Sequence, residues 1–572
     1  MKCPRAEHPN PQWERENWLC LNGQWEFDFD FGKSALDRKL YEGGPLSKTI
    51  TVPFCPESKL SGIGYTDFIP AVVYRKTVTL TEEQASGRVL LHFGAVDYET
   101  WVYVNGKSVC RHRGGYTPFE ADITEVVKAG ENTIFVYAED DIRSGKQCGG
   151  KQSHKFQSHG CFYTRVTGIW QTVWLEFVPK AYILSAKYET HPDSASITVR
   201  GKTSGSGMVT LKTSFEGEET GSAEVYSTGD FSAVIPLSRT ELWELGNGRL
   251  YDLTLSMGDD TVHSYFGLRS VGLEGMKFVL NKKTVFQRLV LDQGYYPDGI
   301  YTAPDEAALV KDIAISMELG FNGARLHQKL FEPRFLYHCD KMGYMVWDEY
   351  GNWNFDCAAP DALNRFLKAW LEVLDRDGNH PSVIGWCPFN ETWDYAENEH
   401  KNELLSSIYE VTKAVDPTRP CIDASGLYHA KTDIFDVHDY TGDPETFAGY
   451  FAGIADGVLL DQIERNPNWK SRQHYNGEPV FVSEYGGIQW SGKQEGDAWG
   501  YGDAPKTPEE FIKRYQGVTD VLLQHPLIMG FCYTQLYDVE QEQNGLYTYE
   551  RQPKFDPEIF RKINQQPAAI EE

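Results

Sequence analysis

Short hydrophobic runs separated by turn residues dominate the first part of the chain. RVLLHFGAV (88–96), TWVYVNG (100–106), NTIFVYAE (132–139) and QTVWLEFV (171–178) are typical of β-strands, and Asn105-Gly106 marks a hairpin turn. We therefore expect a β jelly roll over residues 1–180. The same pattern continues over 181–272, in segments such as SITVRGK, MVTLKTSF and LYDLTLSM. About half a dozen short strands in roughly 90 residues predict an immunoglobulin-like β-sandwich there.

From residue 273 onward, apolar runs alternate with helical segments. Eight candidate strands lie at 285–291, 321–327, 344–349, 382–390, 420–425, 434–440, 479–485 and 528–535. The first helix has Pro304 near its start and Gly320 after its end. Further helices fit 333–342, 361–376, 399–414 and 508–524, whereas no clear helix separates the fifth strand from the sixth. The alternation of eight strands with helical segments predicts a (β/α)8 TIM barrel over 273–572.

Charge and composition exclude several classes of protein. With 55 Lys and Arg against 82 Asp and Glu, the formal net charge is −27, which repels nucleic acids and anionic membranes. No apolar run is long enough for a transmembrane helix, and the first residues lack the apolar core of a signal peptide. The 11 cysteines are sparse and form no CxxC pair. We expect reduced thiols and a cytoplasmic protein.

Two glutamates follow apolar strands of the predicted barrel. The fourth strand ends in Asn390 and Glu391, and the seventh ends in Glu484. Active sites of TIM barrels lie at the carboxyl ends of the strands, so both side chains should face one cleft. Two carboxylates across a cleft are what glycoside hydrolysis needs, one as a proton donor and one ionised. The alternative is that each is a structural glutamate paired with an arginine.

Most other strands of the predicted barrel also end in polar groups. These residues are Asp292, Gln293, Arg325, His327, Glu349, His438, Tyr440 and Gln535. A single histidine at a strand end is usually structural. So many polar strand ends on one face of a barrel favour an active site there, because a face that only stabilises the barrel would not need them.

Motifs along essentially the whole chain resemble glycoside hydrolase family 2, which includes β-galactosidases, β-glucuronidases and β-mannosidases. The resemblance in the first domain rests on LNGQWEF, RVLLHFGAVDYETWVYVNGK and TGIWQTVWLE. In the barrel it rests on GFNGARLHQK, CDKMGYMVWDE, HPSVIGWCPFNE and FVSEYGG. Their joint occurrence in this order is highly specific. The resemblance implies a sugar-binding jelly roll, an immunoglobulin-like domain and a catalytic barrel.

The resemblance also implies roles for the two glutamates. Glu391 matches the general acid/base and Glu484 matches the catalytic nucleophile of the family. The implied reaction is a retaining double displacement, in which the carboxyl groups stand about 5–5.5 Å apart. The pKa of Glu391 should rise while Glu484 is ionised and fall once Glu484 is esterified. This chemistry requires no metal and no organic cofactor.

Further substrate-binding residues follow from the same resemblance. Asn390 resembles the asparagine that contacts the sugar 2-hydroxyl, Tyr440 the tyrosine that bonds the nucleophile, and Arg325 the arginine beside it. Asp141 loosely resembles an acidic loop residue that reaches over the barrel in β-galactosidases. Asp292, His327, His438 and Gln535 complete the predicted sugar-binding set, with a structural role as the alternative for the first three.

The sugar is less clearly indicated. Family β-glucuronidases carry an Asn-x-Lys motif after strand eight that recognises the uronate carboxylate, but here the stretch Glu542–Gly545 reads EQNG, with Asn544 in place of the lysine. We therefore expect an exo-acting β-galactosidase. A β-glucuronidase with a different carboxylate clamp, an α-L-arabinosidase and a catalytically inactive carbohydrate-binding protein are the alternatives.

Acidic residues after the eighth strand leave two interpretations open. Asp538, Glu540 and Glu542, with Arg551, either line the pocket or form a solvated charge run. The expected partner is a glycoside or oligosaccharide, and a homo-oligomer is compatible with the sequence.

Overall fold

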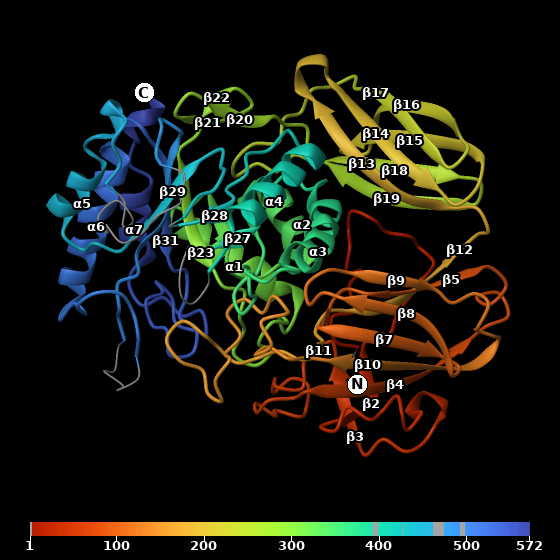
Figure 1. Ribbon diagram of the computed structural model, residues 1–572. Helices are drawn as coiled ribbons and strands as arrows, with labels where there is room; N and C mark the ends of the chain where they lie inside the picture. Colours follow the sequence, from red (N-terminus) through yellow and green to blue (C-terminus); the bar gives the residue numbers. More distant parts are fainter. Residues whose placement is uncertain (1–2, 393–398, 427, 461–473, 492–497) are drawn as a thin grey trace.

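The computed structural model describes residues 3–392, 399–426, 428–460, 474–491 and 498–572. Figure 1 shows two β-domains, coloured red to yellow, stacked beside a larger α/β domain that runs from green to blue. The predicted fold class, a jelly roll and an immunoglobulin-like sandwich followed by a TIM barrel, is confirmed. The domain limits at residues 180 and 272 stay a prediction.

The N-terminal domain consists of two packed antiparallel sheets. One has the strand order β1-β12-β5-β9 and the other β3-β2-β4-β10-β7-β8. Their strands are β1 (Trp18–Cys20), β2 (Gly23–Phe29), β3 (Lys48–Val52), β4 (Ala71–Leu80), β5 (Arg88–Phe93), β7 (Glu99–Val104), β8 (Lys107–Arg113), β9 (Phe119–Asp122), β10 (Gly130–Glu139) and β12 (Val173–Val178), and β6 (Val96–Asp97) pairs with β11 (Gly168–Ile169). Alternate residues such as Trp25 and Phe27 point into the core between the sheets, as period-two strands require.

The second domain is a smaller sandwich. Its sheets have the orders β13-β14-β17 and β16-β15-β18-β19. The strands are β13 (Ile183–His191), β14 (Ser196–Thr203), β15 (Gly207–Phe215), β16 (Glu218–Ser227), β17 (Asp230–Pro236), β18 (Tyr251–Met257) and β19 (Asp260–Phe266). In β17 buried and exposed residues alternate strictly, with one face packed on the core and the other in water. The short strands β20 (Val271–Glu274), β21 (Lys277–Leu280) and β22 (Lys283–Thr284) lead into the barrel.

Parallel strands form the barrel. Its main sheet has the order β26-β25-β24-β23-β31-β30-β29. The strands are β23 (Gln287–Asp292), β24 (Gly323–Leu326), β25 (Met345–Glu349), β26 (Val383–Cys387), β27 (Phe389–Asn390), β28 (Ala424–Ser425), β29 (Phe435–Asp439), β30 (Val480–Gly486) and β31 (Ile528–Thr534). β27 continues β26 and pairs with β28, and the amide of His438 donates to the carbonyl of Gly426 at 3.2 Å. These contacts complete the ring.

Helices surround the barrel strands. They are α1 (Glu306–Glu318), α2 (Pro333–Met342), α3 (Ala362–Asp377), α4 (Asn402–Val415), α5 (Pro444–Phe451), α6 (Pro508–Gln524) and α7 (Pro557–Asn564). The Asp305 side chain caps the first turn of α1, and Gly343 ends α2 with a φ of 68° that favours glycine. The described residues between β28 and β29 form no helix, in line with the sequence pattern, whereas α5 was not predicted. None of the described helices is long and apolar enough to cross a membrane.

A buried arginine joins the two β-domains. Arg15, 4% exposed, donates to Glu176 in β12 of the jelly roll at 2.8 Å and to Asp260 in β19 of the sandwich at 2.8 Å. A third bond reaches the carbonyl of Ile183 at 2.6 Å. Because both carboxylates are themselves buried, removing the cation would leave two uncompensated charges.

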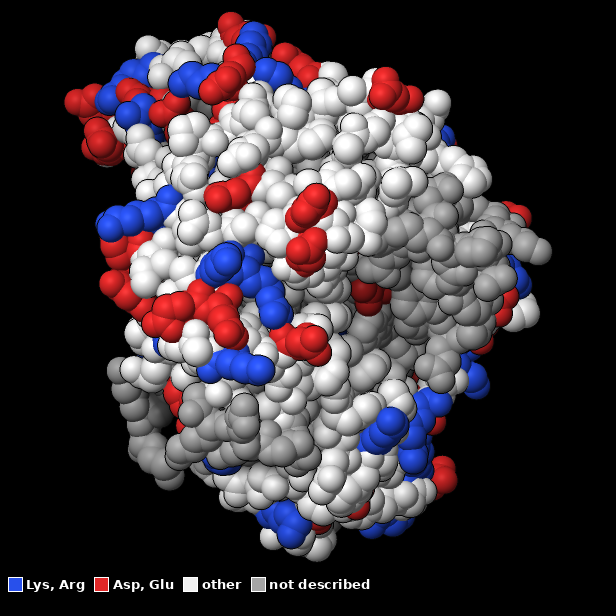
Figure 2. Space-filling view, turned by 90° about the vertical axis from the view of Figure 1, so that its left-hand side faces the viewer, with Lys and Arg blue, Asp and Glu red and all other residues white. Residues whose placement is uncertain are grey.

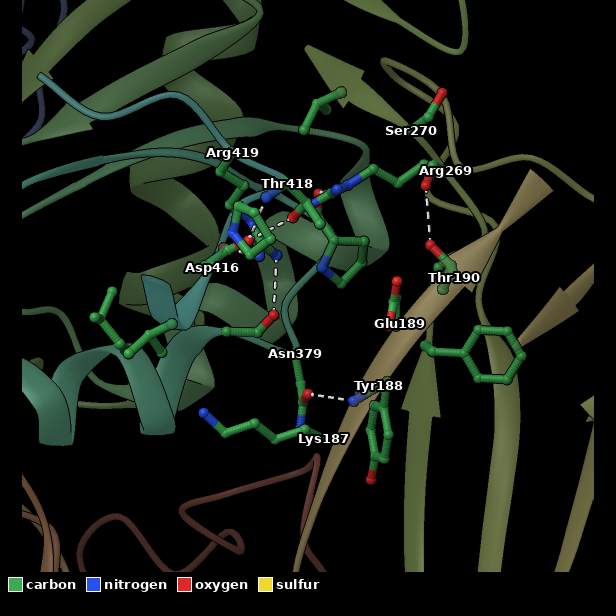
Figure 3. Close-up of a pocket in the computed structure, with 18 of the residues that line it drawn as sticks. Lys187, Tyr188, Glu189, Thr190, Arg269, Ser270, Asn379, Asp416, Thr418 and Arg419 are labelled. Carbon is green, nitrogen blue, oxygen red and sulfur yellow. Dashed lines mark hydrogen bonds and ion pairs between the residues drawn. The ribbon is translucent and has the colours of Figure 1, made fainter. Parts of the chain in front are cut away.

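A cavity lies at the joint between the second sandwich and the barrel. Its volume is about 450 Å³, and its lining includes Tyr188, Arg269 and Asn379 (Figure 3). The Asn379 side chain bonds the backbone of Tyr188 and Ala186, and Arg269 bonds the carbonyl oxygens of Pro381 and Val383, each at 2.9 Å. These polar groups therefore connect the domains to each other. The paired glutamates of the barrel mouth are not part of this cavity.

Charged groups are distributed unevenly over the surface. On the face shown in Figure 2, acidic and basic side chains are interspersed in patches, and acidic atoms appear within a hollow. The net negative charge therefore coexists with local basic groups on this side of the molecule.

We expect the Arg15→Ala variant to lose about 3–5 kcal/mol of the free energy of unfolding, because it leaves Glu176 and Asp260 buried without their counter-charge. Urea denaturation of both variants would measure the loss. Arg200→Ala is the matched control, since Arg200 bonds Glu189 on the exposed surface at 2.7 Å, and it should cost less than about 1 kcal/mol. Equal losses in the two variants would contradict the role of Arg15.

Candidate active site

The two glutamates singled out in the sequence converge at the mouth of the barrel. Glu391 directly follows β27, and Glu484 lies near the end of β30. One carboxylate oxygen of each and a ring nitrogen of His438 all lie within 4.8 Å of one another. Glu484 is 3% exposed, whereas the Glu391 side chain keeps 17% of its surface accessible. The separation fits the short distance of retaining glycosidases, about 5–5.5 Å between carboxyl groups.

Arg325 holds the cluster together from β24. Its guanidinium donates to Glu484 at 2.9 Å, to Glu349 at 2.7 Å and to the side-chain oxygen of Asn390 at 2.5 Å. The side chain is fully buried. The planar guanidinium presents its donors to these acceptors in fixed directions, a geometry that the compact ammonium of a lysine would not reproduce.

The surroundings of Glu484 keep its carboxylate ionised. Burial raises the pKa of this group, but the positive charges of His438 and Arg325 outweigh burial and hold the pKa well below its usual range. Tyr440, whose own pKa is raised by burial and by Glu484, donates its hydroxyl proton to the second carboxylate oxygen. The Tyr440 ring stacks on that of Tyr501 with centroids 3.4 Å apart. Glu484 is thus an anion with fixed orientation.

His438 links the two glutamates. Its Nδ1 lies 2.7 Å from Glu391 and its Nε2 lies 3.4 Å from Glu484. Burial lowers the pKa of the imidazole, but the charge of Glu484 and the bond to Glu391 raise it above its usual value overall. A Cβ at Gly426 would stand 2.4 Å from the His438 ring, and Gly426 has a φ of +109°, so only glycine fits beside this histidine.

Asn390 has a buried side-chain donor next to the catalytic pair. The side chain of Asn352 bonds the backbone of Asn390, accepting from its amide at 2.8 Å and donating to its carbonyl at 3.1 Å. Its side-chain oxygen is occupied by Arg325, and its buried Nδ2 has no partner among the described residues. An orphaned buried donor beside two catalytic carboxylates is suited to bind a substrate hydroxyl. The next residue, Glu391, has a φ of 45°, a strained backbone for a non-glycine residue.

Four hydrogen-bonded side chains line the site beside the catalytic glutamates, and we call them the wall: Gln293, Gln535, Asn544 and Glu542. Gln293 donates to Gln535 at 2.8 Å, Gln535 to Asn544 at 2.8 Å, and Asn544 to Glu542 at 3.1 Å. Tyr163, from the jelly-roll domain, donates its hydroxyl to the other oxygen of Glu542. Burial raises the pKa of Glu542. Gln535 therefore supports this wall and bonds Asn544 and Gln293.

The acidic run after β31 is not a solvated surface. Asp538 pairs with Lys554 at 2.6 Å, and Arg551 pairs with Asp312 at 2.9 Å. Glu540 accepts from a backbone amide of the jelly-roll domain at 3.1 Å. Only Glu542 of this set lies near the catalytic pair.

Two other predicted residues have partners that limit their roles. The Nδ1 of His327 lies 2.9 Å from Glu349, and burial, Lys151 and Arg325 push its pKa far below its usual value, so the ring is neutral. Asp292 accepts from the amide of Gly294 at 2.9 Å and from the Tyr537 hydroxyl. Burial raises the pKa of Asp292 to about 6. Asp292 thus belongs to a hydrogen-bond network with Gly294 and Tyr537.

Asp141 is not brought into the cluster. It lies exposed just after β10, where its amide bonds the Gln147 side chain at 3.0 Å, and it lines a shallow cavity with Lys33 and Arg113. Within the described residues, no hydrogen bond or ion pair joins Asp141 to the glutamates. The later residues Gly149 and Gly150 of the same loop bond the barrel backbone at Trp353 and Gly351. A role of Asp141 in substrate binding stays a prediction.

Sequence reasoning missed residues that this loop delivers. The segment between β10 and β11 of the jelly-roll domain, in orange in Figure 1, extends toward the barrel. It includes Tyr163, which donates to Glu542, and Lys151. The Lys151 ammonium lies 4.2 Å from the ring centroid of Trp353, which follows β25. A lysine after two glycines in an irregular segment gives no periodic signal, so the sequence offered no means of finding it.

Only one set of described residues resembles a metal site. The ligand atoms of Glu391, His438 and Glu484 lie close enough to hold an ion. Glu484, however, is already neutralised by the Arg325 guanidinium at 2.9 Å. A positive charge in that place disfavours a bound cation, and the absence of a required metal remains our prediction.

The fold and the paired glutamates define a retaining glycoside hydrolase. The family model described as "Glycosyl hydrolases family 2, sugar binding domain" matches residues 19–175, and "Glycosyl hydrolases family 2, TIM barrel domain" matches residues 273–566. The chain therefore belongs to glycoside hydrolase family 2.

Relatives extend over the whole chain. A β-glucuronidase of Paenibacillus borealis is 23% identical, with 95% of this chain and 96% of that protein covered. Among solved structures, a β-glucuronidase of an uncultured Clostridium sp. matches with a TM-score of 0.79 and 22% identity, covering 96% and 98% of the two chains. A family 2 β-galacturonidase from Eisenbergiella tayi matches with a TM-score of 0.75 and 18% identity, covering 97% of each chain. These structures share the fold of this protein.

We expect the His438→Gln variant to shift the acid limb of the kcat/KM profile to higher pH. The positive His438 is the first charge that holds the Glu484 pKa down, so removing it raises that pKa and the nucleophile becomes protonated at a higher pH. The rate at the optimum should fall about 10- to 100-fold. An acid limb at an unchanged or lower pH would contradict this electrostatic link.

Proposed function

We propose that the protein is an exo-acting β-glucuronidase that releases terminal β-D-glucuronic acid with retention of configuration. The observation that carries the chemistry is the Glu391–Glu484 pair, whose carboxylate oxygens lie within 4.8 Å of each other and of a His438 ring nitrogen, with Arg325 bonded to Glu484 at 2.9 Å. The sugar is supported by relatives, named β-glucuronidases, that match nearly the full length of the chain. They favour this alternative over the β-galactosidase expected from the sequence.

In the first step Glu484 acts as the nucleophile. Its carboxylate, kept anionic by Arg325 and His438, attacks the anomeric carbon while Glu391 gives a proton to the departing aglycone oxygen. The bond between anomeric carbon and aglycone breaks and an ester to Glu484 forms. Tyr440 holds one nucleophile oxygen and Arg325 the other, which fixes the direction of attack.

In the second step the roles reverse. Glu391, now a carboxylate, removes a proton from water, and the water oxygen attacks the anomeric carbon and expels Glu484. His438, with Nδ1 2.7 Å from Glu391, keeps the Glu391 carboxyl oriented in both steps. The unpartnered Nδ2 of Asn390 supports a bond to the sugar 2-hydroxyl, a contact that would strengthen in the transition state.

A panel of 4-nitrophenyl glycosides tests the proposal. Wild-type protein should hydrolyse the β-D-glucuronide faster than the β-D-galactoside, the α-L-arabinopyranoside and the β-D-galacturonide. Glu484→Ala should lower kcat by about 10⁴-fold or more, because the covalent route is lost. Azide should partly restore turnover and yield the glycosyl azide of inverted configuration.

Two results would overturn the proposal. A wild-type preference for the galactoside would identify the protein as a β-galactosidase. An unchanged rate in the Glu484→Ala variant would show that Glu484 is not the nucleophile. Sugar binding without hydrolysis of any glycoside would instead identify an inactive carbohydrate-binding protein.

We expect Asn390→Ala to lower kcat/KM for the glucuronide about 100-fold or more, since it removes a donor used in the transition state. The same substitution should have little effect on a 2-deoxy-glucuronide, which lacks the hydroxyl that Asn390 would bind. Comparing both substrates on both proteins separates this contact from a general loss of structure. A similar loss on the two substrates would show that Asn390 only supports Arg325.

A further inference from the structure

We propose that Lys151, supplied by the jelly-roll domain, binds the C6 carboxylate of the terminal sugar and makes the site selective for uronides. This assignment rests on the proposed function, because it names the group that would recognise a glucuronic acid residue. It places the specificity determinant outside the catalytic barrel. Nothing in the two-carboxylate chemistry itself requires this residue.

Lys151 is a buried cation without a counter-ion in direct contact. The residue is 5% exposed, and within the described ranges its ammonium makes no ion pair and no hydrogen bond. The ammonium lies over the Trp353 ring, 4.2 Å from its centroid. Ammonium groups removed from water are costly unless they meet an anion or acceptors, so an unpaired one beside a cleft is poised for a ligand.

Lys151 is held beside the catalytic residues through Trp353. Its ammonium lies 4.2 Å from the Trp353 ring centroid, and the Nε1–H of Trp353 donates to the carbonyl of Asn390 at 3.3 Å. Burial lowers the pKa of this lysine, but Cys161, Glu542 and Glu484 raise it above its usual value, so the side chain stays protonated. Glu391 contributes in the same direction.

Glu542 is hydrogen-bonded to residues other than Lys151. One of its oxygens accepts from Asn544 at 3.1 Å and the other accepts from the Tyr163 hydroxyl. No ion pair joins it to Lys151, although both lie at the same wall. A substrate carboxylate entering between them would meet the unpaired ammonium directly.

The other cations of this cluster are already engaged. Arg325 bonds three acceptors, and His438 lies between Glu391 and Glu484. Asn544, on the barrel's own loop, is neutral and bonded at both ends. Among the described residues of the site, Lys151 is thus the cation left for an anionic substrate.

The backbone around Lys151 is fixed before any substrate binds. Amides of Gly149 and Gly150 donate to carbonyls of Trp353 and Gly351 in the barrel at 2.9 and 3.1 Å. The carbonyl of Lys151 accepts from the amide of Tyr163 at 2.7 Å. A Cβ at Gly150 would lie 2.1 Å from the carbonyl oxygen of Gln328, so the close docking needs glycine there. Such preorganisation lowers the entropic cost of holding a ligand.

The competing explanation is that Lys151 only offsets the negative charge of the three nearby glutamates. Both explanations predict a weaker enzyme without the lysine. The two explanations differ for a neutral substrate of the same shape. If Lys151 only offsets the charge of the glutamates, its loss should slow the neutral and the anionic substrate equally. If Lys151 binds the substrate carboxylate, its loss should slow only the anionic substrate.

The test compares 4-nitrophenyl β-D-glucuronide with its 6-methyl ester on wild type, Lys151→Met and Lys151→Gln. Methionine keeps the apolar stem packed on Trp353, and glutamine keeps a donor without the charge. We expect each substitution to lower kcat/KM for the glucuronide about 30-fold or more, and for the neutral ester less than about 3-fold. Lys155→Gln, at an exposed position of the same loop, is the matched control and should behave as wild type.

The unfolding midpoint of each variant checks that the fold is kept, and calorimetric titration with D-glucuronate and D-glucose measures binding directly. Equal losses on glucuronide and ester, or glucuronate affinity unchanged in both Lys151 variants, would overturn the assignment to Lys151. If wild type hydrolyses no uronide yet binds glucuronate through Lys151, the proposed function fails while the anion site stands. If wild type hydrolyses glucuronide and the Lys151 variants keep the same selectivity, the assignment to Lys151 fails while the proposed function stands.

Discussion

One buried guanidinium organises the catalytic centre. Arg325 is fully enclosed, so its charge must be matched by acceptors within the barrel, and Glu349, Glu484 and Asn390 supply them from β25, β30 and β27. The same bonds that satisfy the arginine keep Glu484 ionised and fix the side-chain amide of Asn390 through its oxygen. Stability of the barrel mouth and readiness for nucleophilic attack therefore arise from one set of contacts.

The acidity of the whole chain does not by itself exclude the anionic sugar proposed above. The formal net charge is −27, but Arg325, His438 and Lys151 bring positive charges beside the catalytic glutamates. Burial makes these charges effective at short range, where water cannot screen them. The total charge thus says little about which substrate the interior accepts.

The sequence was informative wherever the chain is periodic. Strand ends of a TIM barrel converge by construction, so Glu391, Glu484 and Arg325 could be placed together from their positions after apolar runs. Irregular loops lack such a rule. Asp141 was predicted from a loose resemblance to a loop residue of β-galactosidases, but the course of its loop depends on contacts with the barrel, and those contacts bring Lys151 to the barrel mouth.

The wall of the pocket was ambiguous for the same reason. Nothing in the run EQEQNG distinguishes a buried Glu542 from a solvated one, because its burial is decided by Tyr163 from a distant part of the chain. Since Tyr163 and Lys151 belong to one domain and Glu484 to another, bond cleavage and the lining of the sugar pocket are encoded separately. Mutations that accumulate in the jelly roll can therefore redirect substrate choice during evolution while the bond-breaking groups stay untouched.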